Sequence, residues 1–505
     1  MVGNYQYLRS STNESEVVLS IDLYSVSIIF LIPLYSETIA APPDNYYDSD
    51  AGSIFNPFQI SSLANLRWLS ETPQIWFVVH NQILVYQYFL QTTDIDASET
   101  VNWNNGEGFR PIGRFSNTEV EASHTYYFHG QYDGNNYKIS NLYLSPNDYT
   151  AINPITNQSN GYAFFDHITN ASLQNIVLEN IYYLVYSEFL FNESKITGIV
   201  SDAMYSTVSN CGITGKIDII VDSIQINTSN IFVSSLANLL DHCYIENCYS
   251  TTDISIRGDT PSLIVSGLAS ILLNSTLMNS FYYGDIIPES QIKISGLAYI
   301  VANHSRIEKC YFTCNYPMDE AYAISTYLID SEILYSFWDK EVSRVDNMVE
   351  INSNSIITNC FGYRTEEMKQ ASSFFNWDFE YIWGINSGVN NGYPFLRNLF
   401  PPVVKSVDHT KPSIQIDFLT NYPNPFNPLT TISFATSVAA NIQIDIYNIK
   451  GQKIRSLYND YTAVGNHQIQ WNGKDDYGQQ VGSGVYLYRL ISDTLDRVQK
   501  MILLK

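Results

Sequence analysis

From about residue 197 to residue 340 the chain alternates short apolar runs with Gly, Asn, Asp and Ser. The runs at 217–221, 253–256 and 291–295 are rich in β-branched residues and partly alternate with polar ones. Short runs of this kind, bounded by turn-forming residues, predict β-strands. None of them carries a long apolar stripe at the helical period of about 3.6 residues, so helical solenoids are disfavoured. We therefore expect a fold made of many short strands.

The same short unit recurs along this region. Each copy has a polar residue, then Cys or Ser, then an aromatic residue or glycine, and successive Cys or Ser positions lie 37, 32, 30, 26 and 24 residues apart. These positions are Cys211, Cys248, Ser280, Cys310, Ser336 and Cys360. Repeats at periods of about 20 to 50 residues are typical of stacked architectures, in which one unit cannot bury its own apolar face. The pattern predicts a right-handed parallel β-helix whose equivalent residues stack about 4.8 Å apart.

Stacking would align the aromatic residues that follow each Cys or Ser. The column is Tyr249, Phe281, Tyr311, Phe337 and Phe361. A regular ladder of rings is more typical of core packing than of a ligand platform. We therefore expect these rings to be buried.

Stacking also constrains the cysteines. Cys248 and Cys310 are two coils apart, which places their Cα atoms about 9 to 10 Å apart, beyond the reach of a disulfide. The pairs that could still bridge are Cys211–Cys248, Cys243–Cys248 and Cys310–Cys314. Cysteines that share a column with serines are more typical of small buried residues, so we favour buried thiols over any disulfide.

The N-terminal region carries three further signals. Residues 17–34 are largely apolar and small residues follow up to 41, which predicts a signal peptide over 1–41, with a membrane anchor as the alternative. Asp22 and the small residues favour cleavage, so we expect no stable transmembrane span after processing. Residues 42–51 have the composition of a linker. Ser61 or Ser62 can cap a short helix over about 61–69, which we expect to cover the open N-terminal edge of the β-helix.

A resemblance to a known family begins at residue 52. The motifs in order are NPFQI at 56–60, FRPIG at 109–113, FHGQYDGN at 128–135 and GYPFL at 392–396. Over residues 52–400 the chain resembles secreted bacterial proteins with GLUG-type repeats. The resemblance implies a β-helix and, only loosely, adhesion or glycan contact, because that family has no shared enzymatic activity.

The last part of the chain has a different pattern. After a predicted linker at 401–417, residues 418–505 contain six or seven short strands separated by turn signals, which predicts a small β-sandwich. This segment resembles the C-terminal sorting domains of the type IX secretion system, which in turn look immunoglobulin-like. The most diagnostic residues are Gly484, Val485 and Tyr486 and the closing run from Lys500 to Lys505. The resemblance implies the type IX secretion machinery as a partner and a secreted or outer-membrane surface location; the alternative is a structural sandwich without a targeting role.

The charge balance fits an exported protein. The chain has 505 residues, with 50 Asp and Glu against 26 Lys and Arg, for a net charge of −24. Nucleic-acid binding is disfavoured, because it needs clustered Lys and Arg. A strongly acidic surface keeps an extracellular protein soluble through self-repulsion.

A column of polar residues is the candidate site for chemistry. Asp253, Asp285 and Asn315 lie five residues after successive column positions. Stacked acids about 5 Å apart can hold Ca²⁺ or act as a glycosidase pair. Asp and Asn also favour turns by bonding their own backbone, and we favour this second interpretation. No other cofactor is predicted.

Basic residues and catalytic motifs give little support for an enzyme. Lys216, Arg257 and Lys293 do not align beside the acids in the repeat alignment, as a polysaccharide lyase would require. His-x-x-x-His groups, nucleophile elbows and phosphate-binding loops are missing from the sequence. We therefore predict no catalytic residues. The predicted function is a non-catalytic surface β-helix that contacts a glycan or a surface protein, or has a structural role; the alternative is a polysaccharide lyase or glycoside hydrolase on the same scaffold.

Overall fold

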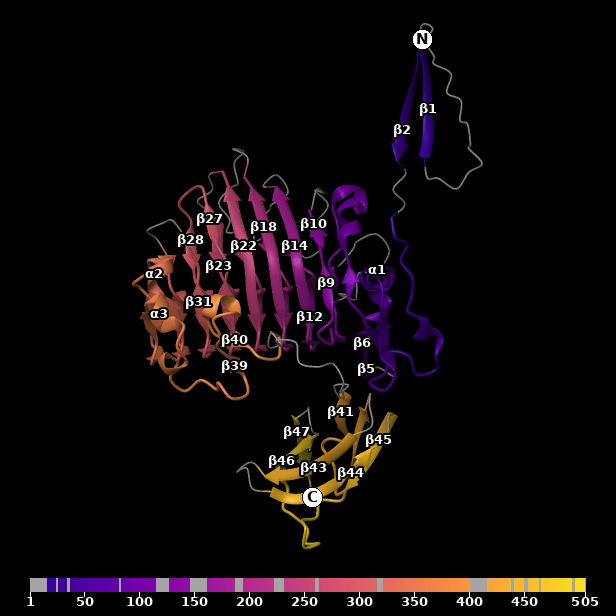
Figure 1. Cartoon of the computed structure of the whole chain (residues 1–505), viewed down its shortest axis with the longest axis vertical. Helices are drawn as coiled ribbons and strands as arrows, with labels where there is room; N and C mark the ends of the chain where they lie inside the picture. Colours follow the sequence, from indigo (N-terminus) through magenta and orange to yellow (C-terminus); the bar gives the residue numbers. More distant parts are fainter. Residues whose placement is uncertain are drawn as a thin grey trace. The chain divides into compact units, whose positions relative to one another are not determined.

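The computed structural model of the chain describes residues 16–399 and 416–504 (Figure 1). Inside these ranges it does not describe 24–25, 34–36, 81–82, 115–126, 146–160, 187–193, 222–230, 259–262, 316–320, 437–439, 449–452, 463–464 and 493–495. The chain forms two compact units, Met1–Val403 and Val404–Lys505. Each unit is described by itself.

The first unit contains the predicted parallel β-helix. One coil runs through β23 (Leu263–Ser266), β24 (Ala269–Leu273), β25 (Thr276–Met278) and β26 (Phe281–Tyr283), and each strand pairs in parallel with its equivalent in the next coil. The coils therefore build four parallel sheets, which we call sheets I to IV in the order of these four strands. Figure 1 shows the strands of successive coils side by side.

Sheets I and II meet at a short turn. Sheet I consists of β11 (Gly161–Tyr162), β15 (Lys195–Ile196), β19 (Ile231–Ser234), β23, β28 (Lys293–Ser295) and β32 (Ala321–Tyr322). Sheet II consists of β12 (Phe165–Thr169), β16 (Val200–Met204), β20 (Ala237–Asp241), β24, β29 (Ala298–Ala302), β33 (Ser325–Ile329) and β36 (Val349–Ser353).

Sheets III and IV complete each coil. Sheet III consists of β3 (Phe58–Ile60), β6 (Tyr88–Gln91), β8 (Gln131–Asp133), β13 (Ser172–Gln174), β17 (Thr207–Ser209), β21 (Tyr244–Glu246), β25, β30 (Arg306–Glu308), β34 (Glu332–Leu334) and β37 (Ile356–Thr358). Sheet IV consists of β7 (Ile95–Asp96), β9 (Lys138–Ser140), β14 (Val177–Tyr186), β18 (Gly212–Ile220), β22 (Tyr249–Arg257), β26, β31 (Tyr311–Thr313), β35 (Phe337–Asp339) and β38 (Phe361–Tyr363), with β10 (Tyr143–Leu144) beside β14 and β27 (Ile286–Pro288) beside β22.

A repeated turn flanks each short strand of sheet III. Asn274 and Asn279, on either side of β25, have φ angles of 49° and 45°, in the left-handed region that Asn tolerates better than most residues. The serine after each Asn points back toward the preceding coil. Ser280 Oγ accepts a hydrogen bond from the Cys248 N–H at 3.1 Å, and Ser275 Oγ accepts one from the Cys243 N–H at 2.9 Å. The polar residue and the small residue of the repeat therefore form a turn that binds the preceding coil.

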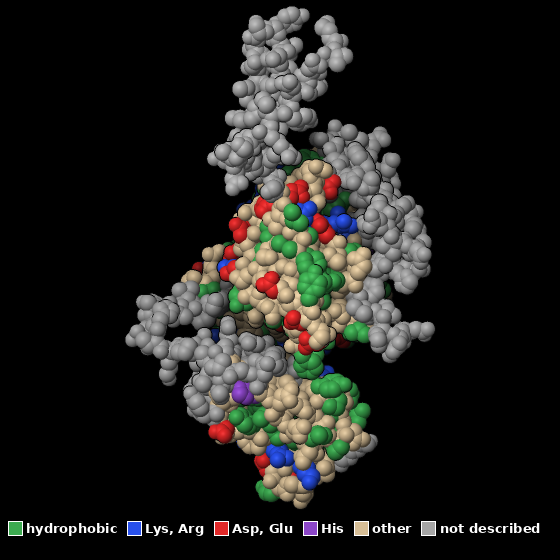
Figure 2. All heavy atoms as spheres, turned by 90° about the vertical axis from the view of Figure 1, so that its right-hand side faces the viewer, with side chains coloured by type: hydrophobic (Ala, Val, Ile, Leu, Met, Phe, Trp, Pro, Cys, Tyr) green, Lys and Arg blue, Asp and Glu red, His purple; other side chains and the backbone are tan. Residues whose placement is uncertain are grey.

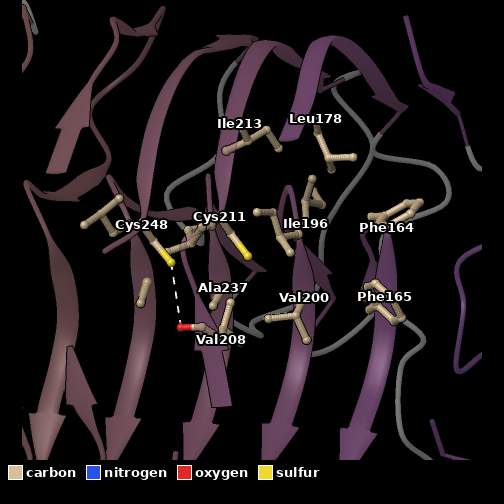
Figure 3. Close-up of a cluster of buried hydrophobic side chains, with 14 of the residues drawn as sticks. Phe164, Phe165, Leu178, Ile196, Val200, Val208, Cys211, Ile213, Ala237 and Cys248 are labelled. Atoms are coloured by element: carbon tan, nitrogen blue, oxygen red, sulfur yellow. Dashed lines mark hydrogen bonds between the residues drawn. The ribbon is translucent and has the colours of Figure 1, made fainter. Parts of the chain in front are cut away.

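The predicted cysteine column lies inside the coils. Figure 3 shows Cys211 and Cys248 among buried apolar side chains of neighbouring coils, with Cys248 Sγ donating to Val208 O at 3.8 Å. All six cysteines are free thiols, and Cys360 alone among them is only half-buried. Burial, together with the neighbouring Cys211, raises the pKa of Cys248 well above its ordinary value. Such thiols are packing residues of low reactivity.

The predicted aromatic ladder also exists. Tyr249, Phe281, Tyr311, Phe337 and Phe361 are register partners in sheet IV. The centroid of the Phe281 ring lies 5.4 Å from that of the Tyr249 ring and 4.8 Å from that of the Tyr311 ring. The three ring planes are nearly parallel. The ladder lies on the outer face of sheet IV, in a second core separate from the one inside the coils.

Residues 364–399 cover this ladder. They include α3 (Thr365–Met368), η7 (Ala371–Ser373), β39 (Trp383–Gly384), η8 (Asn390–Gly392) and β40 (Phe395–Leu396). Trp377 Nε1 donates to Tyr335 O at 2.8 Å, and Tyr311 Oη donates to Pro394 O at 2.7 Å. The covering segment is thus held by hydrogen bonds as well as by apolar contacts with the rings.

The N-terminal end of the β-helix is covered as predicted. The helix α1 (Leu63–Glu71) begins at its N-cap Ser62, whose Oγ accepts a hydrogen bond from the Asn65 N–H at 3.2 Å. Residues 42–51, predicted to be a linker, include η1 (Asp44–Tyr47), and the Tyr46 ring packs 5.3 Å from the Trp68 ring. The remaining elements of this unit are η2 (Pro73–Ile75), β4 (Phe77–His80), β5 (Ile83–Tyr86), η3 (Ser98–Asn102), η4 (Asn104–Gly106) and α2 (Lys340–Ser343).

The predicted targeting segment, 1–41, is described only in part. Residues 1–15 lie outside the described residues, and β1 (Glu16–Leu23) pairs with β2 (Val26–Pro33) as an antiparallel hairpin. In the part of the chain that the structure describes, no helix is both long and apolar enough to cross a membrane. The signal peptide stays a prediction.

The second unit has two antiparallel sheets around one core. One sheet contains β41 (Ile416–Tyr422), β42 (Thr430–Thr436) and β45 (Gly465–Trp471), and the other β44 (Lys453–Thr462), β43 (Ala440–Asn448), β46 (Gly484–Ile491) and β47 (Asp496–Leu503). Residues from both sheets share its core, among them Trp471, Ile444 and Tyr488. The predicted linker at 401–417 falls almost wholly outside the described residues, and the immunoglobulin-like topology stays a prediction.

Candidate functional site

The outer face of sheet IV carries a group of polar side chains that reach solvent. Strands alternate inward and outward side chains, so register partners form columns on one face. One outward column contains Tyr143, Tyr182, Lys216 and Asp253. The rings of Tyr143 and Tyr182 lie 5.9 Å apart. Residues 364–399 do not cover this part of the face, and aromatic and charged side chains lie next to each other on it.

Asp218 is the centre of this face. Lys216 Nζ lies 2.8 Å from Asp218 Oδ1, and Arg257 lies 3.2 Å from Oδ2 through one guanidinium nitrogen. Tyr182 Oη donates to Oδ2 at 3.1 Å. Burial, and next the Asp218 carboxylate, raises the pKa of Tyr182, so its phenol stays a donor at neutral pH. We call Tyr182, Lys216, Asp218 and Arg257 the Asp218 cluster.

We expected from the sequence that Lys216 and Arg257 do not align beside the acids of the Asp253 column, and for Lys216 this was wrong, because it lies directly opposite Asp253. Both cations make their ion pairs with Asp218, an acid outside that column. Lys216 precedes Asp218 by two residues on β18, and Arg257 lies on β22 opposite Ile220, diagonal to Asp218. Same-face neighbours two residues apart and diagonal neighbours are within reach of long side chains. An alignment by column compares only residues directly opposite each other, so it missed this convergence. Lys293, as expected, lies elsewhere, on sheet I.

The structure brings two of the three predicted column residues together. The Asp285 N–H donates to Asp253 Oδ1 at 2.9 Å, and both residues are exposed on the outer face of sheet IV. This bond joins neighbouring coils, and it is not the bond to a residue's own backbone that a turn residue makes. Asn315 is exposed one coil further on. Among the described residues, no group of three His, Cys, Asp or Glu is arranged to hold a metal ion, and calcium binding stays an untested prediction.

The predicted sorting residues lie mostly on one strand pair. Gly484, Val485 and Tyr486 begin β46, and Lys500 lies on β47 opposite Leu487. Tyr486 is a core residue: its ring packs 5.3 Å from the Trp471 ring and its hydroxyl donates to Gly482 O at 2.8 Å. Lys505 lies outside the described residues, and the sorting role of these five residues stays a prediction.

A second group of charged residues was not predicted from the sequence. It lies at the outer corner between sheets I and II, and we call it the His167 cluster. His167 Nδ1 lies 2.9 Å from Asp166 Oδ1, and His167 Nε2 lies 3.1 Å from Asp202 Oδ2. Lys195 Nζ lies 2.5 Å from Asp202 Oδ2, and Arg114 Nε lies 3.6 Å from Asp166 Oδ2. Sequence motifs could not find this cluster, because its members come from four separate segments with no metal or catalytic spacing.

Electrostatics hold the His167 cluster in its charged form. Burial alone would lower the pKa of His167, but the carboxylates of Asp166 and Asp202 outweigh burial and raise it to about 10. Burial alone would raise the pKa of Asp202, but Lys195 and His167 lower it below its ordinary value. His167 is therefore an imidazolium at neutral pH with both N–H groups engaged by carboxylates, which leaves it unsuited to act as a base.

Exposure separates the two groups. The side chains of Lys216 and Arg257 are 43% and 52% exposed, whereas those of His167 and Lys195 are 17% and 16% exposed. A ligand in solution can reach Tyr182, Lys216 and Arg257, whereas the Asp218 carboxylate that holds them is buried. We therefore regard the Asp218 cluster as the candidate binding site and the His167 cluster as a stabilising network.

The His167 cluster makes stability depend on pH. The folded pKa of about 10 lies above the unfolded value of about 6.5, so protonated His167 stabilises the fold fully below pH ~6.5 and loses this contribution as pH rises toward 10. We expect the difference in unfolding free energy between the native chain and His167→Gln to shrink between pH 6.5 and 10, by at most about 1.4 kcal/mol per pH unit. Urea unfolding of both proteins at several pH values measures it, and a difference that is constant with pH would contradict the assignment.

Comparison with known proteins identifies the second unit. Residues 420–504 match the family described as the secretion system C-terminal sorting domain. The chain therefore carries a type IX sorting domain, and it is a secreted or cell-surface protein. This domain implies contact with the type IX secretion machinery. The resemblance of residues 52–400 to GLUG-type repeat proteins stays a prediction.

Solved structures and curated proteins give weaker similarities. A candidate immunoglobulin A1 protease from Bacteroides ovatus is similar over 68% of this chain and 94% of its own, at 14% identity and a TM-score of 0.44. PorZ from Porphyromonas gingivalis, a surface component of the type IX secretion system, is 22% identical over 18% of this chain and 12% of its own, with a TM-score of 0.14. Halomucin from Haloquadratum walsbyi is 36% identical over 91 residues, which are 18% of this chain and 1% of halomucin.

Proposed function

We propose that this protein is displayed outside the cell and that the outer face of sheet IV contacts a glycan without cleaving it. The sorting domain supports the location. The observation that carries the proposal is the Asp218 cluster, in which a buried carboxylate holds the 38% exposed Tyr182 ring beside two half-exposed cations. An aromatic ring offers a flat apolar surface, and the charged groups around it offer hydrogen bonds that fix orientation.

The shape of the face fits an extended chain rather than a small molecule. The long strands β14, β18 and β22, with the short strand β27 beside β22, present their outward side chains in columns along the β-helix. Equivalent positions recur about every 4.8 Å. Consecutive sugar units of a polysaccharide can therefore meet successive columns of outward side chains, with Tyr182, Lys216 and Arg257 distinguishing one position.

The proposal is tested by binding of the purified full-length chain to a glycan array, followed by titration of each hit with variants. Tyr182→Ala is expected to weaken binding at least tenfold, about 1.4 kcal/mol. Tyr244→Ala is the matched control: Tyr244 is 40% exposed on the outer face of sheet III, and Tyr182 is 38% exposed. Equal affinities of the two variants for every hit would reject the face as the binding site.

A second candidate is a polysaccharide-degrading enzyme, the runner-up from the sequence. The convergence of Lys216 and Arg257 on Asp218, with Asp253 on the next strand opposite Lys216, favours it. Release of reducing ends or unsaturated products from a polysaccharide panel, abolished by Lys216→Ala but not by Tyr244→Ala, would establish the enzyme. Binding without release supports the first proposal.

A further inference from the structure

The two ends of the β-helix differ. At the N-terminal end α1 and Tyr46 cover the first coils, where Phe58 and Phe89 are buried. At the other end β36, β37 and β38 are the last strands of sheets II, III and IV, and no described strand pairs with their free sides. Unpaired strand edges carry free N–H and C=O groups that can pair with another chain.

At the end of the aromatic ladder the final coil is exposed where the preceding coil is buried. Phe337 is fully buried, whereas its register partner Phe361 is 50% exposed. Ile351 and Ile356, on β36 and β37, are 42% and 55% exposed, and their register partners Tyr327 and Glu332 in the preceding coil are half-buried. Each earlier coil is buried by the coil that follows it, so the surface left open has the outline of one more coil.

The usual protection of such an edge is missing here. Natural edge strands are protected by Lys, Pro or inward-pointing charges. Residues 349–363, which contain all three final strands, include no Lys, Arg or Pro, and Glu350 is their single charged residue. Apolar side chains and free backbone groups therefore share one open surface.

We propose that two copies of this chain associate end to end through their final coils, with a two-fold axis across β36. A second copy offers the same unpaired edge of β36, and among the described strands of the β-helix this end is the uncovered one. An isologous contact of this kind is self-complementary. Antiparallel pairing of the two β36 strands centred on Ile351 places Ile351 opposite Ile351 of the second copy. Glu350 then faces Asn352 of the second copy instead of another carboxylate.

The acidic net charge sets a condition on this dimer. Two copies of charge −24 repel each other, and salt screens that repulsion. We therefore expect the dimer to be stronger in 0.5 M than in 0.05 M NaCl.

The test is sedimentation equilibrium of the full-length chain and two variants. Ile351→Lys is expected to raise the dimer dissociation constant at least tenfold. Ile54→Lys, at a position 46% exposed near the N-terminal end, is the matched control and is expected to leave it unchanged. A native chain that stays monomeric at all concentrations, or a dimer that Ile351→Lys does not weaken, would overturn the proposal.

Cross-linking distinguishes this geometry from cover by the chain's own second unit or by another protein. Ile351→Cys is expected to form an intermolecular disulfide under mild oxidation, because the two side chains face each other across the axis. Ile54→Cys is the control and is expected not to cross-link. A monomer whose Ile351→Cys thiol is shielded from alkylation would show that this end is covered from within the same chain.

Discussion

Replacement of Phe281 by alanine is expected to lower the free energy of unfolding of the β-helix by about 3–5 kcal/mol, the range for deleting a fully buried aromatic side chain. Phe281 is fully buried in the ladder, and its ring lies 6.1 Å from the Trp383 ring of the covering segment. The substitution removes contacts with the rings on both sides and with the segment that covers them. The loss therefore combines the transfer of the ring to water with a cavity that the rigid coils cannot close.

Urea unfolding followed by tryptophan fluorescence measures this effect, because Trp377 and Trp383 lie in the affected core. Phe361→Ala is the matched control in the same ladder. Phe361 is half-exposed at the end of the column, so its loss is expected to be about 1 kcal/mol or less. Equal losses for the two variants would show that the covering segment does not contribute to stability.

Replacement of Asp166 by alanine is expected to destabilise the first unit by about 3–5 kcal/mol, as when one member of a buried ion pair is removed. The Asp166 side chain is fully buried, and Oδ1 accepts a hydrogen bond from the Gly161 N–H at 2.8 Å in addition to its contact with His167. Without the carboxylate, the imidazolium of His167 and the guanidinium of Arg114 remain in a poorly solvated corner with one counter-charge removed.

The control for this change is Asp346→Ala. Asp346 is exposed, and its replacement is expected to change stability by no more than about 0.5 kcal/mol. Thermal or urea unfolding at pH 7 compares the two variants. If Asp166→Ala unfolds like the native chain, the His167 cluster is not a stabilising network, and its pH dependence should vanish as well.

Much of the fold follows from the repeat itself. A residue that tolerates the left-handed region, followed by a small residue and a ring, needs the same surroundings in every copy, and stacking supplies them. Asn247 and Asn279 adopt φ angles of 53° and 45°, and Cys248 bonds to the Ser280 hydroxyl of the next coil. The capping helix was likewise readable, because Ser62 and the apolar face behind it are local signals.

The sequence of a turn did not predict which sheets its two flanking strands belong to. The Asp133–Asn136 stretch forms a tight turn, with Asn135 and Asn136 at φ angles of 51° and 60°. The turn joins β8 of sheet III to β9 of sheet IV, so its two strands belong to different sheets. A turn sequence determines the local backbone angles, but the partner of each strand is chosen by the coils on either side.

By itself, the sequence determined that equivalent positions stack. A polar residue such as Asn, then Cys or Ser, then an aromatic residue recurs along the chain, and each coil can bury the apolar face of its neighbour. It also determined the location outside the cell, because residues 420–504 carry the pattern of a secretion system sorting domain. The tertiary structure alone decided that the aromatic ladder faces outward, since a ring can be buried on either side of a sheet and residues 364–399 return to cover it. The tertiary structure alone also showed the Asp218 cluster. A column alignment compares residues directly opposite each other, whereas Lys216 reaches Asp218 along its own strand and Arg257 reaches it diagonally from the next strand.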